Sequence, residues 1–209
     1  MAHAPAYVFG YGSLAAAGAL RAPARDGDPR GYVTDLPGHE RRWGVAMDNA
    51  RAIPGYKRYL DAAGRAPALH VCFLDLRPVD EPGGAVPAVN GVCTPVTPRM
   101  LAALDARERN YERVDVTGLV GHAAGTVWAY VGSAAGRARA RAGREAGSAV
   151  VCREYRGRVE RGFARLGPRE MERYRASTAD AALPALALTR TELPPARRRA
   201  GRLLRARTR

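Results

Sequence analysis

The feature that most constrains this chain is a short apolar stretch near the N-terminus that ends abruptly in glycine. Residues Ala6 to Phe9 are β-branched, aromatic or small, and this composition predicts a buried strand. The strand runs into Gly10-Tyr11-Gly12-Ser13, and the small residues Leu14 to Leu20 then predict a helix with Ser13 as its cap. A strand that turns sharply into a helix gathers several free N–H groups, which is a ready site for a carboxylate or a phosphate.

Taken alone, this loop has more than one interpretation. It can be a tight turn in which Gly10 and Gly12 only supply backbone angles that other residues avoid. Gly10-x-Gly12-x-x-Ala15 also fits the permissive form of a dinucleotide-binding fingerprint, with Asp35 at a tolerable distance beyond it. The rest of the chain has to decide between these possibilities.

Length and composition predict one domain with a proper core. The chain has 209 residues, of which 46% are hydrophobic, so it is not disordered as a whole. We expect a domain over residues 1–180 and a partly ordered, arginine-rich tail over residues 181–209. No apolar run approaches membrane-spanning length and the N-terminus lacks the pattern of a secretory signal, so we expect a cytoplasmic protein without membrane contact.

Cysteine and histidine usage predicts neither disulfides nor a metal. Three widely spaced cysteines (Cys72, Cys93 and Cys152) form no C-x-x-C motif, which is typical of reduced core residues in a cytosolic protein. Four histidines are scattered without zinc spacing. We therefore expect no metal.

The formal net charge of +14 would suggest a nucleic-acid partner. However, Lys57 is the only lysine, and such arginine bias accompanies the abundant alanine, glycine and proline expected of a GC-rich genome. Residues 190–209 hold eight arginines against one acid, so about half of the excess charge lies in the tail. A nucleic-acid or acidic partner bound by this tail stays an alternative that we do not favour, and the oligomeric state is open.

The order of predicted elements argues against a dinucleotide-binding fold, which needs strand–helix–strand units in series. Only two strong helices are predicted, both late in the chain, among strands joined by turns, so a mixed or mostly antiparallel sheet is expected. Ala134 to Gly147 is predicted to be exposed and mobile, and Asp48 to Pro67 to be a long polar excursion. Leu69–Leu76 is expected to be a central strand with Val86–Val96 as its partner. Trp43, Val45 and Met47 are expected on one side of a strand over His39–Met47, and the other expected extended segments are Tyr32–Leu36, Arg113–Val120 and Thr126–Val131. The expected helices are Arg99–Arg109 after Thr97-Pro98, Arg169–Arg175, and before the latter a helix that carries Cys152, Tyr155, Val159, Phe163 and Leu166.

One carboxylate breaks the pattern of its helix. Leu101, Leu104 and Glu108 lie at i, i+3 and i+7, so Glu108 should point toward the interior that the leucines face. Desolvation and the negative end of the helix dipole both raise a carboxyl pKa, which would make Glu108 a candidate general base. The alternative is a structural ion pair of Glu108 with Arg42, Arg107 or Arg113, and the spacing alone favours that alternative.

Several motifs together resemble the γ-glutamylcyclotransferase-like superfamily, which includes AIG2-like and γ-glutamylamine cyclotransferase-like proteins. Tyr11-Gly12-Ser13-Leu14 is similar to the family's YGSL substrate loop, and Leu104-Asp105-Ala106-Arg107-Glu108 is similar to its helix ending in LDxRE. Pro54-Gly55-Tyr56-Lys57 also resembles a stretch of the family, and Arg153 to Phe163 resembles its C-terminal helix, where a tyrosine approaches the substrate. The likeness covers about residues 7 to 178.

The resemblance implies an α+β fold with a small mixed β-barrel flanked by helices. It also implies an enzyme that cyclises a γ-glutamyl group to 5-oxoproline without a cofactor, with Glu108 as catalytic base. Substrate would contact Tyr11, Gly12, Ser13 and Leu14 and the helix residue Tyr155. Tyr155 could equally be a core tyrosine and Ser13 only a helix cap. Leu14 stands where the eukaryotic glutamyl-peptide members of the family usually have asparagine, so the exact substrate stays open. A non-catalytic member that binds a γ-glutamyl or carboxylate ligand also stays an alternative.

Overall fold

The computed structural model describes residues 5–19, 31–79, 88–121, 125–179 and 182–195 of the chain. Its first sheet is built around the N-terminal strand β1 (Ala6–Gly10), which pairs antiparallel with β6 and parallel with β8. The five strands have the order β2 (Tyr32–Leu36), β6 (Val89–Val96), β1, β8 (Thr126–Gly132) and β7 (Tyr111–Asp115). The sheet is therefore mixed, as predicted.

The second sheet has β5 (His70–Pro78) at its centre, which confirms the prediction from its two apolar faces. Its order is β10 (Thr178–Ala179), β3 (His39–Asp48), β5, β9 (Ala149–Cys152) and β11 (Ala185–Leu186). The expectation that Val86–Val96 pairs with Leu69–Leu76 is wrong, because β6 pairs with β1 and β2 in the first sheet. Residues 80–87 lie outside the described part of the chain.

A third, two-stranded sheet joins distant parts of the chain. β4 (Lys57–Leu60) lies within the stretch predicted as a polar excursion, and it pairs antiparallel with β12 (Thr189–Glu192). The loop before β4 is also tied to this end of the chain, because the Leu193 amide donates to the Tyr56 carbonyl at 2.8 Å. Residues 189–193 therefore pack beside β4, whereas residues 196–209 lie outside the described part of the chain.

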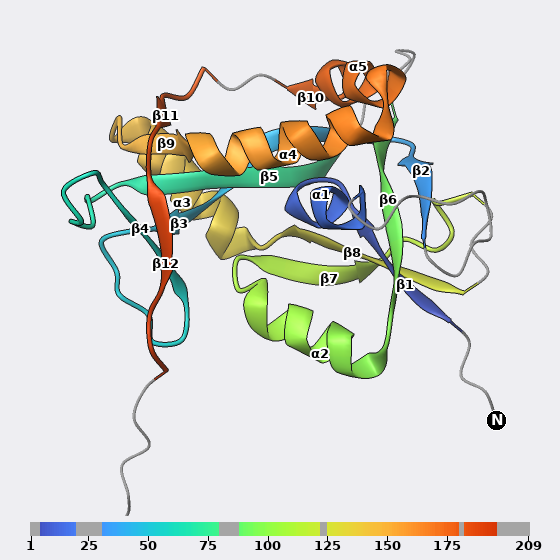
Figure 1. Cartoon of the computed structure of the whole chain (residues 1–209), viewed down its shortest axis with the longest axis horizontal. Coiled ribbons are helices and arrows are strands. Elements are labelled where there is room, and N and C mark those ends of the chain that lie inside the picture. The colour runs from blue at the N-terminus through green and yellow to red at the C-terminus, as the bar shows by residue number, and fades with distance from the viewer. Residues whose placement is uncertain (1–4, 20–30, 80–87, 122–124, 180–181, 196–209) are drawn as a thin grey trace, which may run out of the picture.

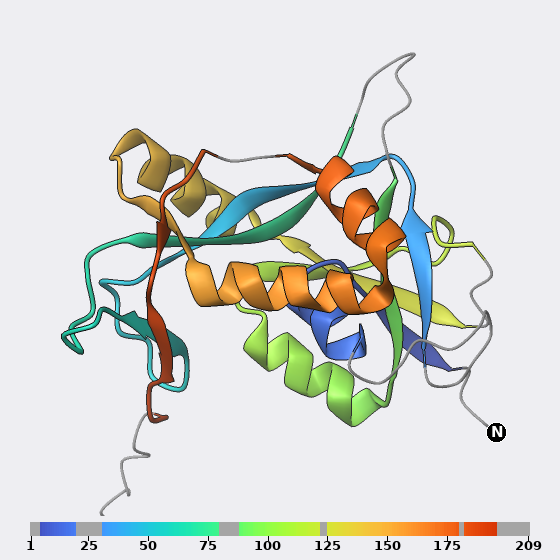
Figure 2. The same cartoon turned by 45° about the horizontal axis from the view of Figure 1, so that its top comes forward.

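Five helices flank the sheets in the described residues (Figures 1 and 2). They are α1 (Ser13–Ala19), α2 (Pro98–Arg107), α3 (Ala134–Glu145), α4 (Arg153–Leu166) and α5 (Pro168–Ala176). Thr97 caps α2 as predicted, since its side chain accepts a hydrogen bond from the Met100 amide at 3.2 Å. The expected α+β class, with a curled mixed sheet flanked by helices, is confirmed; the curled sheet forms a half-barrel.

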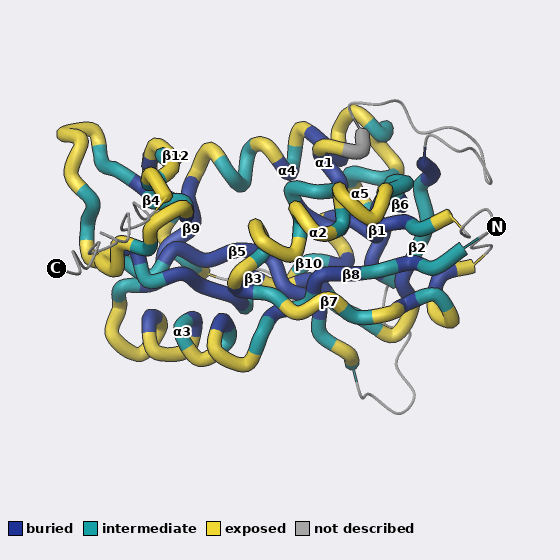
Figure 3. Tube along the Cα trace, turned by 90° about the horizontal axis from the view of Figure 1, so that it is seen from below, coloured by how far each residue is buried: buried dark blue, intermediate teal, exposed yellow. Residues whose placement is uncertain are grey.

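Ala134 to Gly147 was expected to be exposed and mobile; most of its residues are exposed, but the segment is a regular helix rather than a mobile stretch. This segment forms α3, which packs on β3 with its small residues Gly136, Ala140 and Gly143 buried (Figure 3). A Cβ atom on Gly143 would lie 2.5 Å from the His70 Cβ, so the absence of side chains permits the close approach. A sequence of alanine, glycine and arginine has little apolar surface, so the packing of α3 on β3 can be recognised only from the tertiary structure.

A β-bulge changes the side-chain pattern of β3. The register with β5 shifts between Arg42 and Val45, so one extra residue lies on β3 there. Trp43 consequently packs in the main core, whereas Met47 packs in a second apolar cluster with Val71 and others. The expectation that Trp43, Val45 and Met47 share one face is therefore wrong, because the bulge resets the alternation.

Two fully buried charged side chains join the layers. Asp75 on β5 accepts hydrogen bonds from the Gly132 amide at 2.7 Å and from Arg137 of α3 at 2.8 Å, so it links both large sheets to α3. Arg41 on β3 donates to Ser177 at 3.0 Å, and its guanidinium carbon lies 4.9 Å and 4.7 Å from the centres of the Phe163 and Tyr174 rings, which stack on each other. The three cysteines are free and buried, as predicted.

Candidate active site

Tight packing explains the glycines of the loop between β1 and α1. A Cβ atom on Gly10 would lie 2.4 Å from the backbone nitrogen of Ala15, and one on Gly12 would lie 3.3 Å from the Tyr155 hydroxyl. Among the described glycines, the six with positive φ are all elsewhere in the chain. The interpretation that Gly10 and Gly12 supply unusual backbone angles is therefore wrong, and what they supply is room for the chain to fold back on itself.

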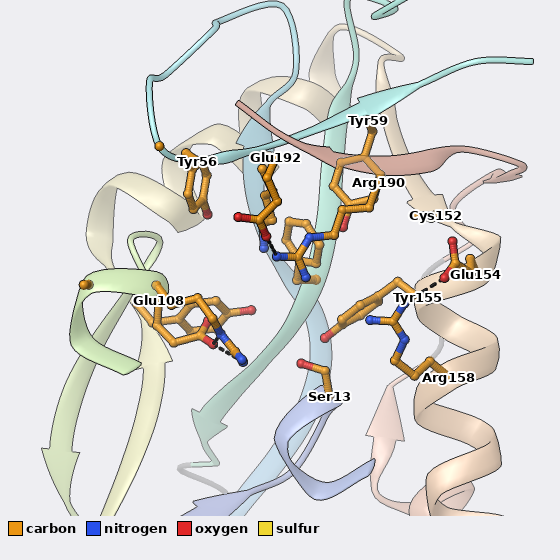
Figure 4. A pocket seen from close by; sticks show the side chains of 16 residues that line it. Ser13, Tyr56, Tyr59, Glu108, Cys152, Glu154, Tyr155, Arg158, Arg190 and Glu192 are labelled. Atoms are coloured by element: carbon orange, nitrogen blue, oxygen red, sulfur yellow. Dashed lines mark hydrogen bonds and ion pairs between the residues drawn. The ribbon is translucent and has the colours of Figure 1, made fainter. Parts of the chain in front are cut away.

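The helix begins one residue earlier than predicted. The Ala16 amide donates to the Gly12 carbonyl at 3.1 Å, so Gly12 occupies the cap position and Ser13 is the first helical residue. The Ser13 side chain instead points toward the hydroxyl group of Tyr155 on α4 (Figure 4). The amides of the first turn have no helical partner and point away from the helix, which leaves them available to an anion.

Glu108 lies directly after α2 and forms its C-cap, since its amide donates to the Leu104 carbonyl at 2.8 Å. The helix ends at Arg107 rather than near Arg109 as predicted. The Glu108 side chain is 12% exposed, and its Oε1 lies 2.7 Å from the Arg107 guanidinium. Leu101 and Leu104 are only half-buried, so the α2 face is less enclosed than predicted. Of the three arginines considered as partners, Arg107 is the one observed.

The ion pair does not close the site, because Glu108 lines two adjoining cavities. An inner cavity of about 30 Å³ is bounded by Leu74, Tyr111, Tyr130 and Tyr155 and by the four loop residues Tyr11, Gly12, Ser13 and Leu14 together with Glu108. An outer cavity of about 90 Å³ shares Ser13, Glu108, Tyr111 and Tyr155 with it. The structure thus brings the predicted loop, the predicted acid and the predicted tyrosine into one place.

Figure 4 shows how these groups face one another. Glu108 enters from the end of α2, Ser13 from the start of α1, and the Tyr155 ring from α4 on the opposite side. The Tyr155 ring also packs edge-on against Phe73 and Trp43, with ring centroids 5.1 Å and 6.0 Å away. Tyr155 was expected to be either a core tyrosine or a substrate contact. Its ring packs in the core, and its hydroxyl group borders the cavities where a substrate could reach it.

The tyrosine hydroxyls around the inner cavity are neutral donors. Burial raises the pKa of Tyr11, Tyr111 and Tyr155 above the usual range, and nearby Glu108 acts in the same direction on all three. Tyr11 donates to the Tyr130 carbonyl at 2.6 Å, and Tyr111 donates to the Leu74 carbonyl at 2.8 Å. These two bonds fix the wall of the cavity, while Tyr155 and Ser13 present hydroxyl groups to it.

The outer cavity is walled by charged side chains from four elements, α2, α4, β4 and β12. Each of its three arginines has a glutamate partner: Arg107 with Glu108, Arg158 with Glu154 on α4, and Arg190 with Glu192 on β12. The remaining cation is Lys57, at the start of β4. Burial lowers the pKa of Lys57 to about 8, with Glu108 opposing that shift.

Sequence reasoning did not select Lys57, Arg190 or Glu192 as site residues. Lys57 belongs to the Pro54–Lys57 stretch that resembles the family, which was the available signal, although no role was assigned to it. Arg190 and Glu192 lie in the part expected to be tail. They reach the cavity because β12 pairs with β4, and a pairing of strands over 120 residues apart leaves no local trace in sequence.

Among the described residues, no group of three His, Cys, Asp or Glu side chains is placed to hold a metal ion. No helix in the same residues is long and apolar enough to cross a membrane.

Comparison with known families agrees with the geometry. The family model described as gamma-glutamyl cyclotransferase, AIG2-like, matches residues 8–148, which is more than half of the chain. The chain therefore belongs to the AIG2-like gamma-glutamyl cyclotransferase family, and its fold is the γ-glutamylcyclotransferase-like fold that the motifs implied. Membership supports a cyclotransferase-like enzyme in general. No curated protein matches the sequence.

Proposed function

We propose that the protein cyclises the γ-glutamyl group of a small γ-glutamyl amine or peptide to 5-oxoproline and releases the amine, with Glu108 as general acid/base. One observation carries the proposal: the loop of residues 11–14 and the Glu108 carboxylate border the same small cavity. A carboxylate-binding turn opposite an acid/base residue is the arrangement that this intramolecular reaction requires.

The loop serves to hold the substrate. Amides at the start of α1 donate charge-assisted hydrogen bonds to the α-carboxylate of the γ-glutamyl unit, with the Ser13 hydroxyl beside them. The tight turn at Gly10 fixes the position of these amides. Attacker and target share one molecule, so alignment supplies much of the acceleration, up to about 7–11 kcal/mol for ideal intramolecular geometry.

Glu108 moves the proton. The substrate's α-amine attacks its own γ-carbonyl carbon and loses a proton to Glu108, which gives a tetrahedral intermediate. The bond from that carbon to the departing nitrogen then breaks, and Glu108 returns the proton to this nitrogen. The products are 5-oxoproline and the free amine, and the carboxylate ends in its starting state.

Release of 5-oxoproline from γ-glutamyl compounds tests the proposal. Glu108→Gln should lower kcat by about 10²–10⁴-fold, because it removes the proton acceptor and keeps the side-chain shape. Glu112→Gln is the matched control, since Glu112 is an exposed glutamate on the neighbouring β7 and should turn over like wild type. A Glu108→Ala protein with full activity would exclude this mechanism. A wild-type protein that binds the compounds without releasing 5-oxoproline would instead be a non-catalytic member.

A further inference from the structure

The outer cavity holds one cation that makes no direct ion pair with the described residues. Its three arginines are each paired with a glutamate, whereas the ion pairs and hydrogen bonds of the described residues include none to the Lys57 ammonium group. Buried charges in proteins are normally paired. An ammonium group beside a cavity that has glutamates nearby but no direct ion pair is therefore positioned to bind a carboxylate from a ligand.

Aromatic rings support this ammonium group without using its hydrogen bonds. The Lys57 Nζ lies 3.9 Å from the centre of the Phe73 ring and 5.5 Å from that of Tyr56. Such contacts stabilise a cation through the ring face but leave its N–H donors unused. Lys57 lies opposite Glu192 in the β4–β12 pairing, so the backbone position of the cation is also fixed.

The position of Lys57 relative to the two cavities places it near the departing-amine end of a bound substrate. Lys57 lines the outer cavity and not the inner one, and the two meet at Ser13, Glu108, Tyr111 and Tyr155. A γ-glutamyl unit held by the loop in the inner cavity would therefore extend its departing amine past Glu108 into the outer cavity. Whatever that amine carries is what Lys57 encounters.

We infer that Lys57 binds a carboxylate on the departing amine, so that the substrates are γ-glutamyl amino acids or peptides rather than γ-glutamyl amines that lack an acid. The inference rests on the proposed function. A polyamine adduct would place like charges together at Lys57 and would be disfavoured. Lys57 therefore determines which departing amines the enzyme accepts.

A matched substrate pair tests this. γ-Glutamylglycine and γ-glutamylglycinamide have nearly the same shape and differ in the terminal charge. Wild type should favour γ-glutamylglycine by about 10- to 100-fold in kcat/KM, the range for a hydrogen bond between charged groups, and Lys57→Met should remove that preference. Arg65→Met is the control, because it removes an 80% exposed cation from the loop after β4 and should keep the preference.

Direct binding separates this inference from the proposed reaction. Titration calorimetry of both compounds with Glu108→Gln protein, with and without Lys57→Met, needs no turnover. Tighter binding of γ-glutamylglycine that depends on Lys57 supports the inference even if wild type releases no 5-oxoproline, an outcome that would overturn only the reaction. Equal binding of the two compounds overturns the inference, even if both are turned over.

Discussion

Glu108 and Lys57 show two ways of holding a charge beside a cavity. Glu108 lies 2.7 Å from the Arg107 guanidinium and still borders both the inner and the outer cavity, so its carboxylate is ion-paired and yet accessible to a ligand. Lys57 has aromatic neighbours and a lowered pKa of about 8, because burial disfavours its charged form. The first arrangement suits a group that must exchange a proton with the substrate, and the second suits a group that gains its partner only when a ligand arrives.

The Lys57 pKa predicts a pH dependence of substrate preference. Glu108 and Arg107 face Lys57 from the end of α2, and Arg190 and Glu192 face it from β12. Burial is the main cause that lowers the Lys57 pKa to about 8; the two arginines lower it further and the two glutamates raise it. Lys57 is protonated below that pH and loses its charge as the pH rises through it. The wild-type ratio of kcat/KM for γ-glutamylglycine over γ-glutamylglycinamide should therefore fall as the pH rises through about 8, since kcat/KM reports the free enzyme.

The ratio is the informative quantity, because ionisation of the substrate's α-amine affects both compounds alike and cancels. In Lys57→Met the same ratio should stay flat over this range. A wild-type ratio that does not change across pH 8 would contradict a carboxylate contact at Lys57.

Tyr155→Phe separates the two parts of the Tyr155 side chain. The ring contacts with Phe73 and Trp43 remain, while the hydroxyl next to Ser13 is lost. We expect kcat/KM to fall by about tenfold, the order of one hydrogen bond, with a loss of stability of about 1 kcal/mol. Steady-state kinetics and thermal denaturation measure the two effects. Unchanged kinetics would make Tyr155 a core residue only.

At the residue scale, the sequence allowed the two halves of the inner cavity to be proposed but not the outer one. The loop and Glu108 each stand in a recognisable local motif, and the helical spacing of Leu101, Leu104 and Glu108 gives a direction. The charged wall of the outer cavity comes from β4 and β12, whose contact is formed by backbone pairing across the chain. Periodicity carries no information about such a partner.

Single elements were predictable where a local signal marks their ends. The Thr97-Pro98 start of α2 is such a signal, and the structure shows the Thr97 cap that it implies. α3 has comparable signals only at its cap, Ser133, and its sequence of alanine, glycine and arginine has no apolar stripe. Its packing depends on small residues that contact β3 and His70, which only the tertiary structure defines.

Two glycines within helices test this account of α3. In Gly143→Ala the new methyl group would lie 2.5 Å from His70, and overpacking of this kind costs about 1–3 kcal/mol. In Gly157→Ala on α4 the nearest atom is the end of the flexible Arg161 side chain, so the helix should gain about 0.5–1 kcal/mol. Chemical denaturation measures both. Equal effects of the two substitutions would show that α3 does not pack closely.

At the scale of the whole molecule, late residues of the chain form one wall of the candidate active site. β12 returns to pair with β4, and this brings Arg190 and Glu192 to the outer cavity. The mixed character of the sheet was predictable from the order of elements. The division into two large sheets was not, since it depends on which strand β6 joins and on the Asp75 contact with Gly132.

Two truncations separate the roles of the late residues. A chain that ends at Pro195 loses seven arginines and should keep its turnover, because β12 and the cavity wall remain. A chain that ends at Leu188 loses β12 and should lose thermal stability and most of its 5-oxoproline release. Turnover that depends on residues 196–209, or that survives the loss of β12, would contradict this division.

The shorter truncation also tests the nucleic-acid alternative. If the late arginines bind nucleic acid, removing them should weaken binding to duplex DNA and flatten its dependence on salt. If their charge is only compositional, a salt titration will show the same weak binding with and without them.

The most direct test of the central claim is a crystal structure of the Glu108→Gln protein with γ-glutamylglycine bound. The account predicts the α-carboxylate at the first turn of α1 beside Ser13, the scissile amide next to position 108, and the terminal carboxylate at the Lys57 ammonium group. A ligand found elsewhere, such as in the arginine-lined cavity between β3 and α3, with the space between Ser13 and position 108 empty, would contradict it.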